Sequence, residues 1–422
     1  MFEIVSIVGL GYIGLPTAAM FAKSKIKVIG VDINRHAVDT INKGETHIVE
    51  PDLDVIVRAA VRQGYLRATS KPEPADAFLI AVPTPFIGDY EPDLSFVKAA
   101  AKSIAPVLKK GDLVILESTS PVGTTEQVAG WLAEERSDLK FPHQHGDHAD
   151  IYVAYCPERV LPGKVVEELV SNDRIIGGLT VRCSERAIEL YKTFVKAECI
   201  VTNVRVAEMC KLTENAFRDV NIAFANELSI ICDELGVDVW QLISLANRHP
   251  RVKVLSPGPG VGGHCIAVDP WFIVHKSPST ARLIKSAREI NDEKPDWVLK
   301  KIEVKISEFL KNNAGRTRDS LVVGCFGIAF KPDIDDLRES PALAIVSRLL
   351  QAKLGKVLVV EPNIEMLPEG LEAAELTHIS AAIPRCDLAI FLVKHSSFIP
   401  LSDTALASIP IVIDACGVLA RQ

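Results

Sequence analysis

The chain has 422 residues, which is too long for one ordinary hydrophobic core and predicts two or three domains. Hydrophobic residues make up 48% and charged residues 24%, as in soluble globular proteins, while a formal charge of −7 argues against a non-specific nucleic-acid binder. A membrane anchor is not expected, because no apolar run approaches the roughly 18–20 residues that span a bilayer.

Cysteine usage favours a reducing, cytoplasmic location. The nine cysteines are odd in number and scattered, and they contain no CxxC pair, so neither a zinc site nor a disulfide framework is expected. The N-terminal stretch MFEIVSIVGLGYIGLP lacks a basic leader region and predicts a structural strand instead of a signal peptide.

Short apolar runs alternate with helical patterns in the first part of the chain. Segment 94–111 has the apolar spacing and the final glycine of a helix. The apolar runs are typical of parallel strands that are buried on both faces. They predict a doubly wound sheet with strands within residues 3–10, 27–33, 77–83, 113–119 and 151–157.

The pattern changes at about residue 204. Residues 204–235 contain neither proline nor glycine and predict one long helix. Apolar residues on much of its circumference predict that this helix is well buried, between the subunits of a homodimer. More helix is expected within residues 239–247, 281–292 and 296–310.

Strand and helix patterns alternate again after the polar stretch 311–320. A second parallel sheet is expected from strands within residues 321–328, 356–362, 388–394 and 411–417. The expected fold class is therefore α/β, with two Rossmann-like doubly wound parallel-sheet domains joined by a helical segment. The expected domains are residues 1–200, 201–312 and 313–422.

The first expected strand leads into VGLGYIGLP, which places Gly9, Gly11 and Gly14 in GxGxxG spacing. These glycines allow a tight turn and the close approach of backbone to a pyrophosphate at a helix N-terminus. Asp32 ends the second strand, where a carboxylate accepts hydrogen bonds from an adenosine ribose and repels a 2′-phosphate, which favours NAD over NADP. Arg35 weakens that preference slightly. The alternative is a glycine turn that binds nothing.

Two loops follow strands of the first sheet, at residues 82–85 and 117–125. Ligands bind such sheets at the carboxyl ends of strands. Thr84 and Thr119 offer hydroxyl groups there, and each is either a ligand contact or a turn or cap residue.

The segment GPGVGGHCIAVDP, residues 258–270, places Cys265 directly after a glycine-rich run. Most unpaired cysteines are small buried hydrophobes, but a bare glycine backbone lets a ligand approach closely and its amides stabilise an anion. Cys265 is therefore a candidate nucleophile. The adjacent His264 either helps to lower the thiol pKa or points away. Asp269 either acts on a proton or a water, or caps the helix that follows.

Lys211 and Asn215 are four residues apart in the long helix and share one face. They form a solvated stripe or, if that face meets the cysteine, bind a developing oxyanion. A dehydrogenase with a nucleophilic cysteine oxidises an alcohol to an aldehyde, which the thiolate captures as a thiohemiacetal. A second hydride transfer gives a thioester, water releases a carboxylate, and two NAD are reduced for each substrate.

Seven motifs support this chemistry, and in chain order they are GLGYIGLP, VPTP, STSPVGTT, CPERVLPG, AEMCKLTENAFRDVNIAFANE, GPGVGGHC and FGIAFKPDIDDLRESPA. In the residues and the order of these motifs, the chain resembles the UDP-glucose/GDP-mannose dehydrogenase family along essentially its whole length. HPRVKVLSPGPGVGGHCIAVDPWFIV and AYCPERVLPG are most similar to the branch that oxidises UDP-N-acetyl-D-mannosamine for enterobacterial common antigen and related polysaccharides. The resemblance implies a cytoplasmic NAD enzyme with a UDP-sugar substrate, no metal and a homodimeric assembly.

The resemblance also implies a role for each matching residue. Cys265 is the thioester nucleophile, and Asp269 assists its activation or the hydrolytic water. Lys211 and Asn215 stabilise oxyanions, while Thr119 and Glu158 position the water and the substrate. The implied cofactor contacts are Gly9, Gly11, Tyr12, Ile13, Gly14, Asp32, Arg35, Thr84, Thr119 and Lys331. The implied substrate contacts are Glu158, Arg159, Val160, Leu161, Lys211, Asn215, Arg248, His249, Arg251, Gly260, Gly262, Lys331 and Arg338.

Two positions depart from the wider family. UDP-glucose members usually read NPEFLREG and GGSCFPKD, where this chain has Pro162 in place of an acid and Val268 in place of a lysine. Proton transfer is therefore expected to depend more on Glu158, Asp269 or water.

The C-terminal loop that carries Lys331 and Arg338 ends at residues 340–341, a Ser-Pro pair expected as N-cap and first helical position. Cations in this loop suit a diphosphate or a domain contact, although nearby acids offer a structural ion-pair network instead. The family's substrate-binding arginine, contributed by the neighbouring subunit, is expected at Arg251 in preference to Arg248.

Two rival functions stay open at this point. One is a two-electron NAD-dependent dehydrogenase for a hydroxyacid or sugar phosphate, in which Cys265 is structural and one NADH is released. The other is a nucleotide-sensing or scaffolding protein that retains NAD, which the presence of Cys265, Lys211, Asn215 and Glu158 disfavours.

Overall fold

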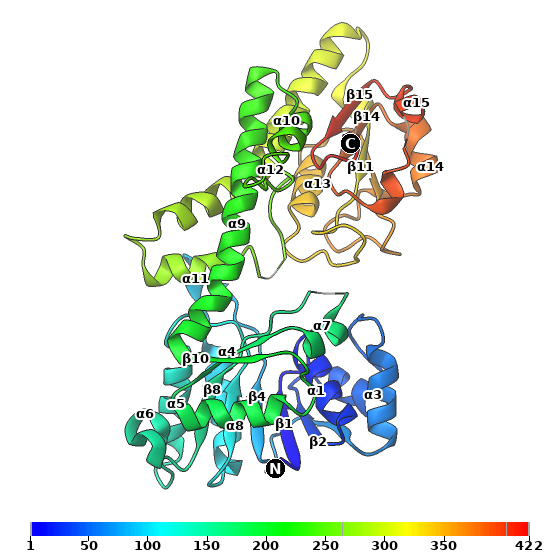
Figure 1. The fold of residues 1–422 in the computed structure, drawn as a ribbon. Helices are drawn as coiled ribbons and strands as arrows, with labels where there is room; N and C mark the ends of the chain where they lie inside the picture. Colours follow the sequence, from blue (N-terminus) through cyan, green and yellow to red (C-terminus); the bar gives the residue numbers. More distant parts are fainter. Residues whose placement is uncertain (1, 162, 264, 402, 421–422) are drawn as a thin grey trace. The chain divides into compact units, whose positions relative to one another are not determined.

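The protein forms two compact units, Met1–Glu214 and Asn215–Gln422, each with its own sheet (Figure 1). Helix α9 (Val204–Leu235) begins in the first unit and ends in the second. The computed structural model describes residues 2–161, 163–263, 265–401 and 403–420. The three-domain division expected from the sequence stays a prediction.

The first unit is built on an eight-stranded sheet with the order β10-β9-β8-β7-β4-β1-β2-β3. Neighbouring strands are parallel except β8 and β9, which pair in antiparallel fashion. The predicted strands are confirmed, whereas β3, β9 and β10 are additional to the prediction. The strands are β1 (Ile4–Val8), β2 (Lys27–Val31), β3 (Leu66–Thr69), β4 (Ala77–Ile80), β7 (Leu113–Leu116), β8 (Tyr152–Tyr155), β9 (Arg174–Gly178) and β10 (Cys199–Asn203), beside the small hairpin β5 (Phe86–Ile87) and β6 (Glu91–Pro92).

Helices cover both faces of this sheet. Alternate strand residues enter different cores: Leu79 of β4 belongs to one hydrophobic cluster and the next residue, Ile80, to the other. The first cluster includes residues of α1, α3, α7 and α8, and the second includes residues of α4 and α5. The fold is therefore doubly wound, as predicted. The helices are α1 (Gly14–Lys23), α2 (Arg35–Asn42), α3 (Leu53–Arg62), α4 (Ser95–Ile104), α5 (Thr124–Glu135), α6 (Pro142–His145), α7 (Val165–Ser171) and α8 (Val181–Tyr191).

The strand order locates the region where ligands bind such sheets. β1 lies between β2 and β4, so the chain leaves β1 toward one edge of the sheet and later returns on the other side. In open α/β sheets the crevice at this reversal, beyond the carboxyl ends of the strands, holds the ligand. The glycine turn that follows β1 lies at this reversal.

The second unit contains an all-parallel five-stranded sheet with the order β13-β12-β11-β14-β15. Its four predicted strands are confirmed, and the two-residue β13 is additional. The strands are β11 (Val322–Phe326), β12 (Lys356–Val360), β13 (Glu375–Leu376), β14 (Leu388–Phe391) and β15 (Ile411–Asp414). The helices that follow α9 are α10 (Val239–Ala246), α11 (Asp269–Lys276), α12 (Arg282–Asn312), α13 (Pro341–Gln351), α14 (Ile379–Ala382) and α15 (Asp403–Leu406).

Helix α12 differs from its prediction because it continues through Pro295, where two helical stretches were expected. A proline inside a helix removes one backbone hydrogen bond and clashes with the preceding turn. Neighbouring side chains on the inner face, including Asn291, Lys294 and Val298, are buried. Their packing offsets the local cost, so tertiary contacts override the proline.

Helix α9 has the predicted bounds, and its predicted burial between the subunits of a homodimer stays a prediction. Phe217, Phe224, Ile231 and Leu235 are 71%, 54%, 44% and 71% exposed. The first three recur every seven residues and therefore share one face. These four side chains, called the α9 stripe below, are an apolar surface that this chain does not cover. Within the described residues, no helix is long and apolar enough to cross a bilayer.

Candidate functional site

The glycine turn between β1 and α1 has two glycines that the fold itself requires. Gly9 has a φ of 93°, and a Cβ there would lie 2.5 Å from the Ala81 carbonyl oxygen. A Cβ on Gly14 would lie 1.8 Å from the Gly9 carbonyl oxygen. Gly11 differs, because a Cβ there would meet no described atom within 4 Å. The open side of Gly11 is where a bare backbone admits a pyrophosphate, so this turn fits a dinucleotide.

Asp32 follows β2 and faces the same turn. Its carboxylate accepts hydrogen bonds from the backbone N–H of Leu10 and of Asn34, both at 2.8 Å. Each carboxylate oxygen has a second lone pair that can accept a ribose hydroxyl.

Sequence reasoning missed His47, whose pKa is lowered by burial while the charge of Asp32 opposes that shift. His47 lies in a loop without any motif, so no sequence signal pointed to it.

The other expected cofactor residues of the first unit lie at the start of α1, at the start of α2 and in the loops after β4 and β7. Ile13 is the N-cap of α1, Tyr12 is exposed, and Arg35 begins α2. The Thr84 hydroxyl donates to the Thr119 carbonyl oxygen at 2.6 Å, which joins the loops after β4 and β7. Thr84 thus has the structural role that the sequence left open, and its oxygen retains acceptor capacity toward a ligand.

Glu158 lies in the loop after β8, and both of its carboxylate oxygens are engaged. One accepts the N–H of Arg159 at 2.7 Å, and the other lies 2.9 Å from the Arg174 guanidinium. Arg159 forms an ion pair with Glu214 at 2.7 Å. Val160 is half-buried and Leu161 is exposed, and Pro162 lies outside the described residues. These contacts fix the positions of Glu158 and Arg159 within the loop.

The second unit contains the cysteine turn. The Cys265 carbonyl oxygen accepts the N–H groups of Val268 at 3.1 Å and Asp269 at 2.9 Å. Asp269 is buried at the start of α11, and its carboxylate accepts a hydrogen bond from the Asn215 side chain. The structure therefore brings Asn215 of α9 to the turn that carries Cys265. Lys211 lies one helical turn before Asn215 on the same face of α9. His264 lies outside the described residues.

Exposure separates Cys265 from the other cysteines. All nine lie in the described part of the chain, and Cys265 is the one with an exposed side chain. Burial raises the pKa of Cys156 to about 12 and that of Cys386 to about 11. Thiols with such values stay protonated at neutral pH and are poor nucleophiles. Among the described cysteines, the geometry favours Cys265 as the reactive one.

The glycines before Cys265 have a structural role that the sequence did not reveal. At Gly260, Gly262 and Gly263, the direction in which a side chain would point is occupied by protein. A Cβ on Gly262 would lie 2.5 Å from the Glu339 carbonyl oxygen, and one on Gly263 would lie 2.9 Å from the Phe330 ring. Gly263 also donates its N–H to the Arg338 carbonyl oxygen at 3.2 Å. The run thus packs directly on segment 330–341.

A Gly262→Ala substitution is expected to reduce activity strongly and to lower the melting temperature, because its Cβ collides with backbone. The matched control is Gly258→Ala, where the nearest atom to a Cβ is 3.9 Å away. Thermal unfolding and steady-state kinetics of the two variants check this prediction. Equal behaviour of the two alanine variants would contradict the packing argument.

The C-terminal loop follows β11 and precedes α13. Ser340 caps α13 by accepting the Leu343 N–H, which confirms the predicted N-cap, and Pro341 is the first helical residue. Arg338 is exposed and pairs with Asp336, and Lys331 is half-buried. Three further residues expected at the substrate lie just after α10 and are exposed, namely Arg248, His249 and Arg251.

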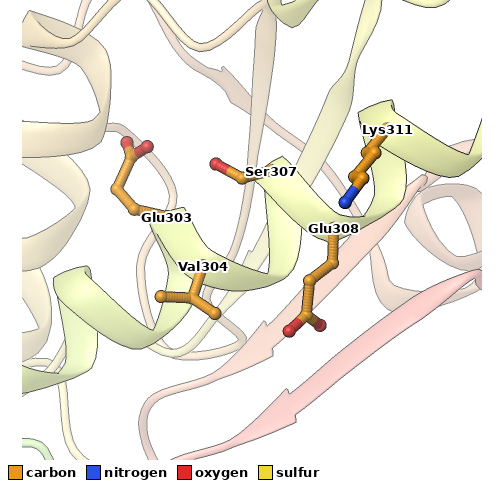
Figure 2. Close-up of a pocket in the computed structure, with 5 residues that line it drawn as sticks. All are labelled: Glu303, Val304, Ser307, Glu308 and Lys311. Carbon is orange, nitrogen blue, oxygen red and sulfur yellow. The ribbon is translucent and has the colours of Figure 1, made fainter.

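A separate pocket lies along α12, far in sequence from these residues. Figure 2 shows its lining, which comes from one helix: Glu303, Val304, Ser307, Glu308 and Lys311. None of these residues was a sequence candidate. A pocket lined by one face of a single helix lacks the convergent polar groups of a ligand site. The glycine turn of the first unit and the cysteine turn of the second therefore stay the candidate sites.

Comparison with known proteins agrees with this arrangement of motifs. Models of the UDP-glucose/GDP-mannose dehydrogenase family match residues 3–195 as the NAD-binding domain, residues 205–293 as the central domain and residues 324–421 as the UDP-binding domain.

Several relatives match over nearly the whole chain. An NDP-N-acetyl-D-galactosaminuronic acid dehydrogenase of Ralstonia solanacearum is 63% identical, covering 99% of this chain and 96% of the relative. A UDP-N-acetyl-D-mannosamine dehydrogenase of Escherichia coli K12 is 60% identical over 99% of both chains. Among solved structures, the UDP-N-acetyl-mannosamine dehydrogenase of Staphylococcus aureus is 42% identical with a TM-score of 0.86, covering 99% of this chain and 96% of that one.

The matches extend over both sheets and the long helix, and the glycine turn has the open side that a dinucleotide needs. The protein is an NAD-dependent dehydrogenase, and the chain belongs to the UDP-glucose/GDP-mannose dehydrogenase family.

Proposed function

We propose that this protein oxidises the primary alcohol of UDP-N-acetyl-D-mannosamine to the carboxylate in two hydride transfers, with Cys265 as the covalent catalyst. The observation that carries the proposal is the cysteine turn, where the exposed Cys265 accepts the Asp269 N–H through its carbonyl oxygen and Asp269 accepts the Asn215 amide. Relatives that are 60% identical bear the name of this activity. NAD, when bound, supplies the hydride acceptor for both oxidations.

The chain's own residues account for the remaining steps. The first hydride loss turns the alcohol into an aldehyde, and the hydroxyl proton passes to a base or water. The Cys265 thiolate then adds to the aldehyde carbon, and loss of the second hydride leaves a thioester. Lys211 and Asn215 are placed on one helix face to stabilise the oxyanion. Water cleaves the thioester, with Glu158 orienting the water, and regenerates the thiol.

Asp269 is assigned a supporting role in this scheme. It is buried, begins α11 and accepts the Asn215 amide. It therefore fixes the amide that faces the oxyanion and sits within one turn of the thiol. The sequence also suggested that Asp269 activates the thiol or the hydrolytic water, and that role stays part of the proposal.

A second candidate substrate follows from the comparisons. Relatives at 63% identity carry both names: that of Ralstonia solanacearum is named for N-acetyl-D-galactosaminuronic acid, and that of Yersinia pestis for N-acetyl-D-mannosamine. The Escherichia coli relative at 60% is also named for N-acetyl-D-mannosamine. Both sugars carry an acetamido group at the second carbon, so the two names agree on a nucleotide-linked N-acetylhexosamine. They differ in the configuration of the ring.

The deciding experiment incubates the full chain with NAD and one nucleotide sugar at a time. The sugars are UDP-N-acetylmannosamine, UDP-N-acetylgalactosamine, UDP-N-acetylglucosamine, UDP-glucose and GDP-mannose. We expect two NADH for each UDP-N-acetylmannosamine, with the uronate confirmed by mass. A higher kcat/KM for UDP-N-acetylgalactosamine would establish the second candidate. One NADH and an aldehyde product would instead indicate a two-electron dehydrogenase with a structural cysteine.

We further infer that the protein is a homodimer through the α9 stripe. Its four exposed apolar side chains lie on one helix, and contiguous exposed apolar surface marks an interface. Light scattering is expected to give twice the chain mass, and Phe224→Glu is expected to shift the protein toward monomer. A monomeric mass for the unaltered chain would contradict this inference.

The proposed setting is the cytoplasm, where the uronate would supply a cell-surface polysaccharide such as enterobacterial common antigen. The support is the pattern of buried cysteines, which suits a reducing compartment, together with the named activity of the relatives.

A further inference from the structure

Glu158 belongs to a buried group of ionisable side chains in the first unit. The acid–arginine cluster, as it is called here, consists of Glu117, Glu158, Arg174 and Tyr191. Their exposed fractions are 2%, 7%, 3% and 0%. Charged side chains this deeply buried are rare unless they are paired. The cluster therefore needs an explanation beyond packing.

The topology of the sheet brings these side chains together. β8 and β9 are antiparallel, with Ala154 opposite Gly178 and Tyr155 opposite Gly177. The same register, continued past the end of the ladder, places Glu158 opposite Arg174. A parallel strand in place of β9 would have sent Arg174 to the other end of the sheet. The antiparallel pairing of β8 and β9 thus places the Arg174 guanidinium beside Glu158.

The contacts within the cluster form a chain. The Arg174 guanidinium lies 2.9 Å from Glu158 Oε2 and 5.0 Å from the centre of the Tyr191 ring. The Tyr191 hydroxyl donates to Glu117 Oε1 at 2.6 Å. The nearby Cys156 thiol is buried and neutral, because burial raises its pKa to about 12. Tyr191 is likewise neutral, because burial raises its pKa well above the usual value.

The charges of the cluster balance when one of its two acids carries a proton. With both carboxyls ionised and one guanidinium, a dry site would hold a net negative charge, which is costly. Burial raises the pKa of Glu117 to about 7, against the opposing charge of Arg174 and with a further rise from Glu158. Below that pH Glu117 is neutral, so Glu158 is the one carboxylate of the cluster that the Arg174 charge pairs with.

We propose that Arg174 is a positioning residue that holds Glu158 as an oriented carboxylate for the hydrolytic step, with Glu117 as the neutral acid that balances the cluster. This inference rests on the proposed function for the part that Glu158 plays toward water. Arg174, Glu117 and Tyr191 do not touch the reacting atoms. They act through Glu158, whose second oxygen is anchored to the Arg159 backbone.

The first test needs no turnover. Infrared difference spectra of the full chain are expected to show a protonated carboxyl band well below pH 7 that disappears well above it. Glu117→Gln is expected to lack this band. Glu189→Gln, which removes a surface acid paired with Arg186 on α8, is expected to keep it. Persistence of the band in Glu117→Gln would overturn the assignment of the proton to Glu117.

Tyr191→Phe supplies a conservative variant for the same measurement. The Tyr191 hydrogen bond lowers the pKa of Glu117, so its removal is expected to move the loss of the band to higher pH. Tyr152→Phe, a change in neighbouring strand β8, is the matched control and is expected to leave the midpoint in place. If the pH at which the carboxyl band is lost does not change in Tyr191→Phe, the hydrogen bond from Tyr191 to Glu117 is contradicted.

The second test follows the reaction. Without the guanidinium, Arg174→Gln is expected to move the acid limb of the kcat profile to higher pH by about one unit. It is expected to slow thioester hydrolysis more than the first NADH burst, while Arg174→Lys restores part of the shift. The inference would be overturned by an active Arg174→Gln variant that keeps the acid limb of the kcat profile and the ratio of thioester hydrolysis to the first NADH burst. Failure of the unaltered chain to form acid from any nucleotide sugar would instead refute the proposed function.

Discussion

A Cys265→Ser variant is expected to lose acid formation by a factor of about a thousand or more, because a serine hydroxyl is far less ionised than a thiol and forms no thioester. The exchange replaces sulfur by oxygen on an exposed side chain whose backbone is held by the Val268 and Asp269 amides. The fold and the glycine turn are therefore expected to survive unchanged. NADH release and product mass, measured in one reaction, check this result.

The control for that variant is Cys199→Ser. Cys199 begins β10, is half-buried, and has its pKa raised by burial. Its replacement is expected to leave the stoichiometry at two NADH for each sugar. Retention of stoichiometric acid formation by Cys265→Ser would refute the covalent mechanism, whatever the identity of the sugar.

Arg288→Met is expected to destabilise the second unit by about 3–5 kcal/mol, because it leaves a buried charge without its partner. Arg288 on α12 and Asp219 on α9 are 1% and 0% exposed and lie 2.6 Å apart. Asn291 donates to the same carboxylate at 2.8 Å. Urea unfolding of the full chain, followed at several pH values, measures the loss.

The pH dependence of that loss has a defined sign. Burial already raises the pKa of Asp219, and the Arg288 charge opposes the rise. Without Arg288 the folded protein holds the proton more tightly than the unfolded chain does. Its stability therefore falls as pH rises above the ordinary aspartate value of about 4. The penalty in Arg288→Met is expected to be smallest in acid and largest near neutrality.

Two comparisons isolate the buried pair. The double variant Arg288→Met with Asp219→Leu removes both charges and is expected to recover much of the lost stability. Arg348→Met breaks an exposed pair with Asp296 and is expected to cost less than about 1 kcal/mol. Equal losses of unfolding free energy in Arg288→Met and Arg348→Met would show that breaking the buried pair costs no more than breaking the exposed one.

Much of the fold was predictable because local sequence patterns indicate most of its strands and helices. The parallel strands are continuous apolar runs, and each predicted strand lies inside its predicted range. α9 is a segment without proline or glycine and has its predicted bounds. β9 was missed because Arg174–Gly178 ends in two glycines and starts with a charge. The uninterrupted α12 was missed because buried contacts, which no local pattern reports, outweigh Pro295.

The candidate site was predictable only in part. The sequence picked out the glycine turn, Asp32 and Cys265, since each belongs to a compact motif. It gave no sign of the Arg174–Glu158 pair or of the close packing of Gly262 on Glu339, because those partners are far apart along the chain. Exposure of a thiol is likewise a property of the folded chain. Sequence therefore named the chemical groups, and tertiary contacts determine how each is held.

The packing of the glycine run on segment 330–341 constrains any attempt to re-engineer the enzyme. Three positions of the run are glycines at which an added Cβ would lie closer than an ordinary contact to that segment or to α12. A graft of segment 330–341 from another nucleotide-sugar dehydrogenase is expected to displace the turn of Cys265, the proposed nucleophile. Such grafts have to transplant residues 258–263 as well, so that the two segments are exchanged as one interlocking module.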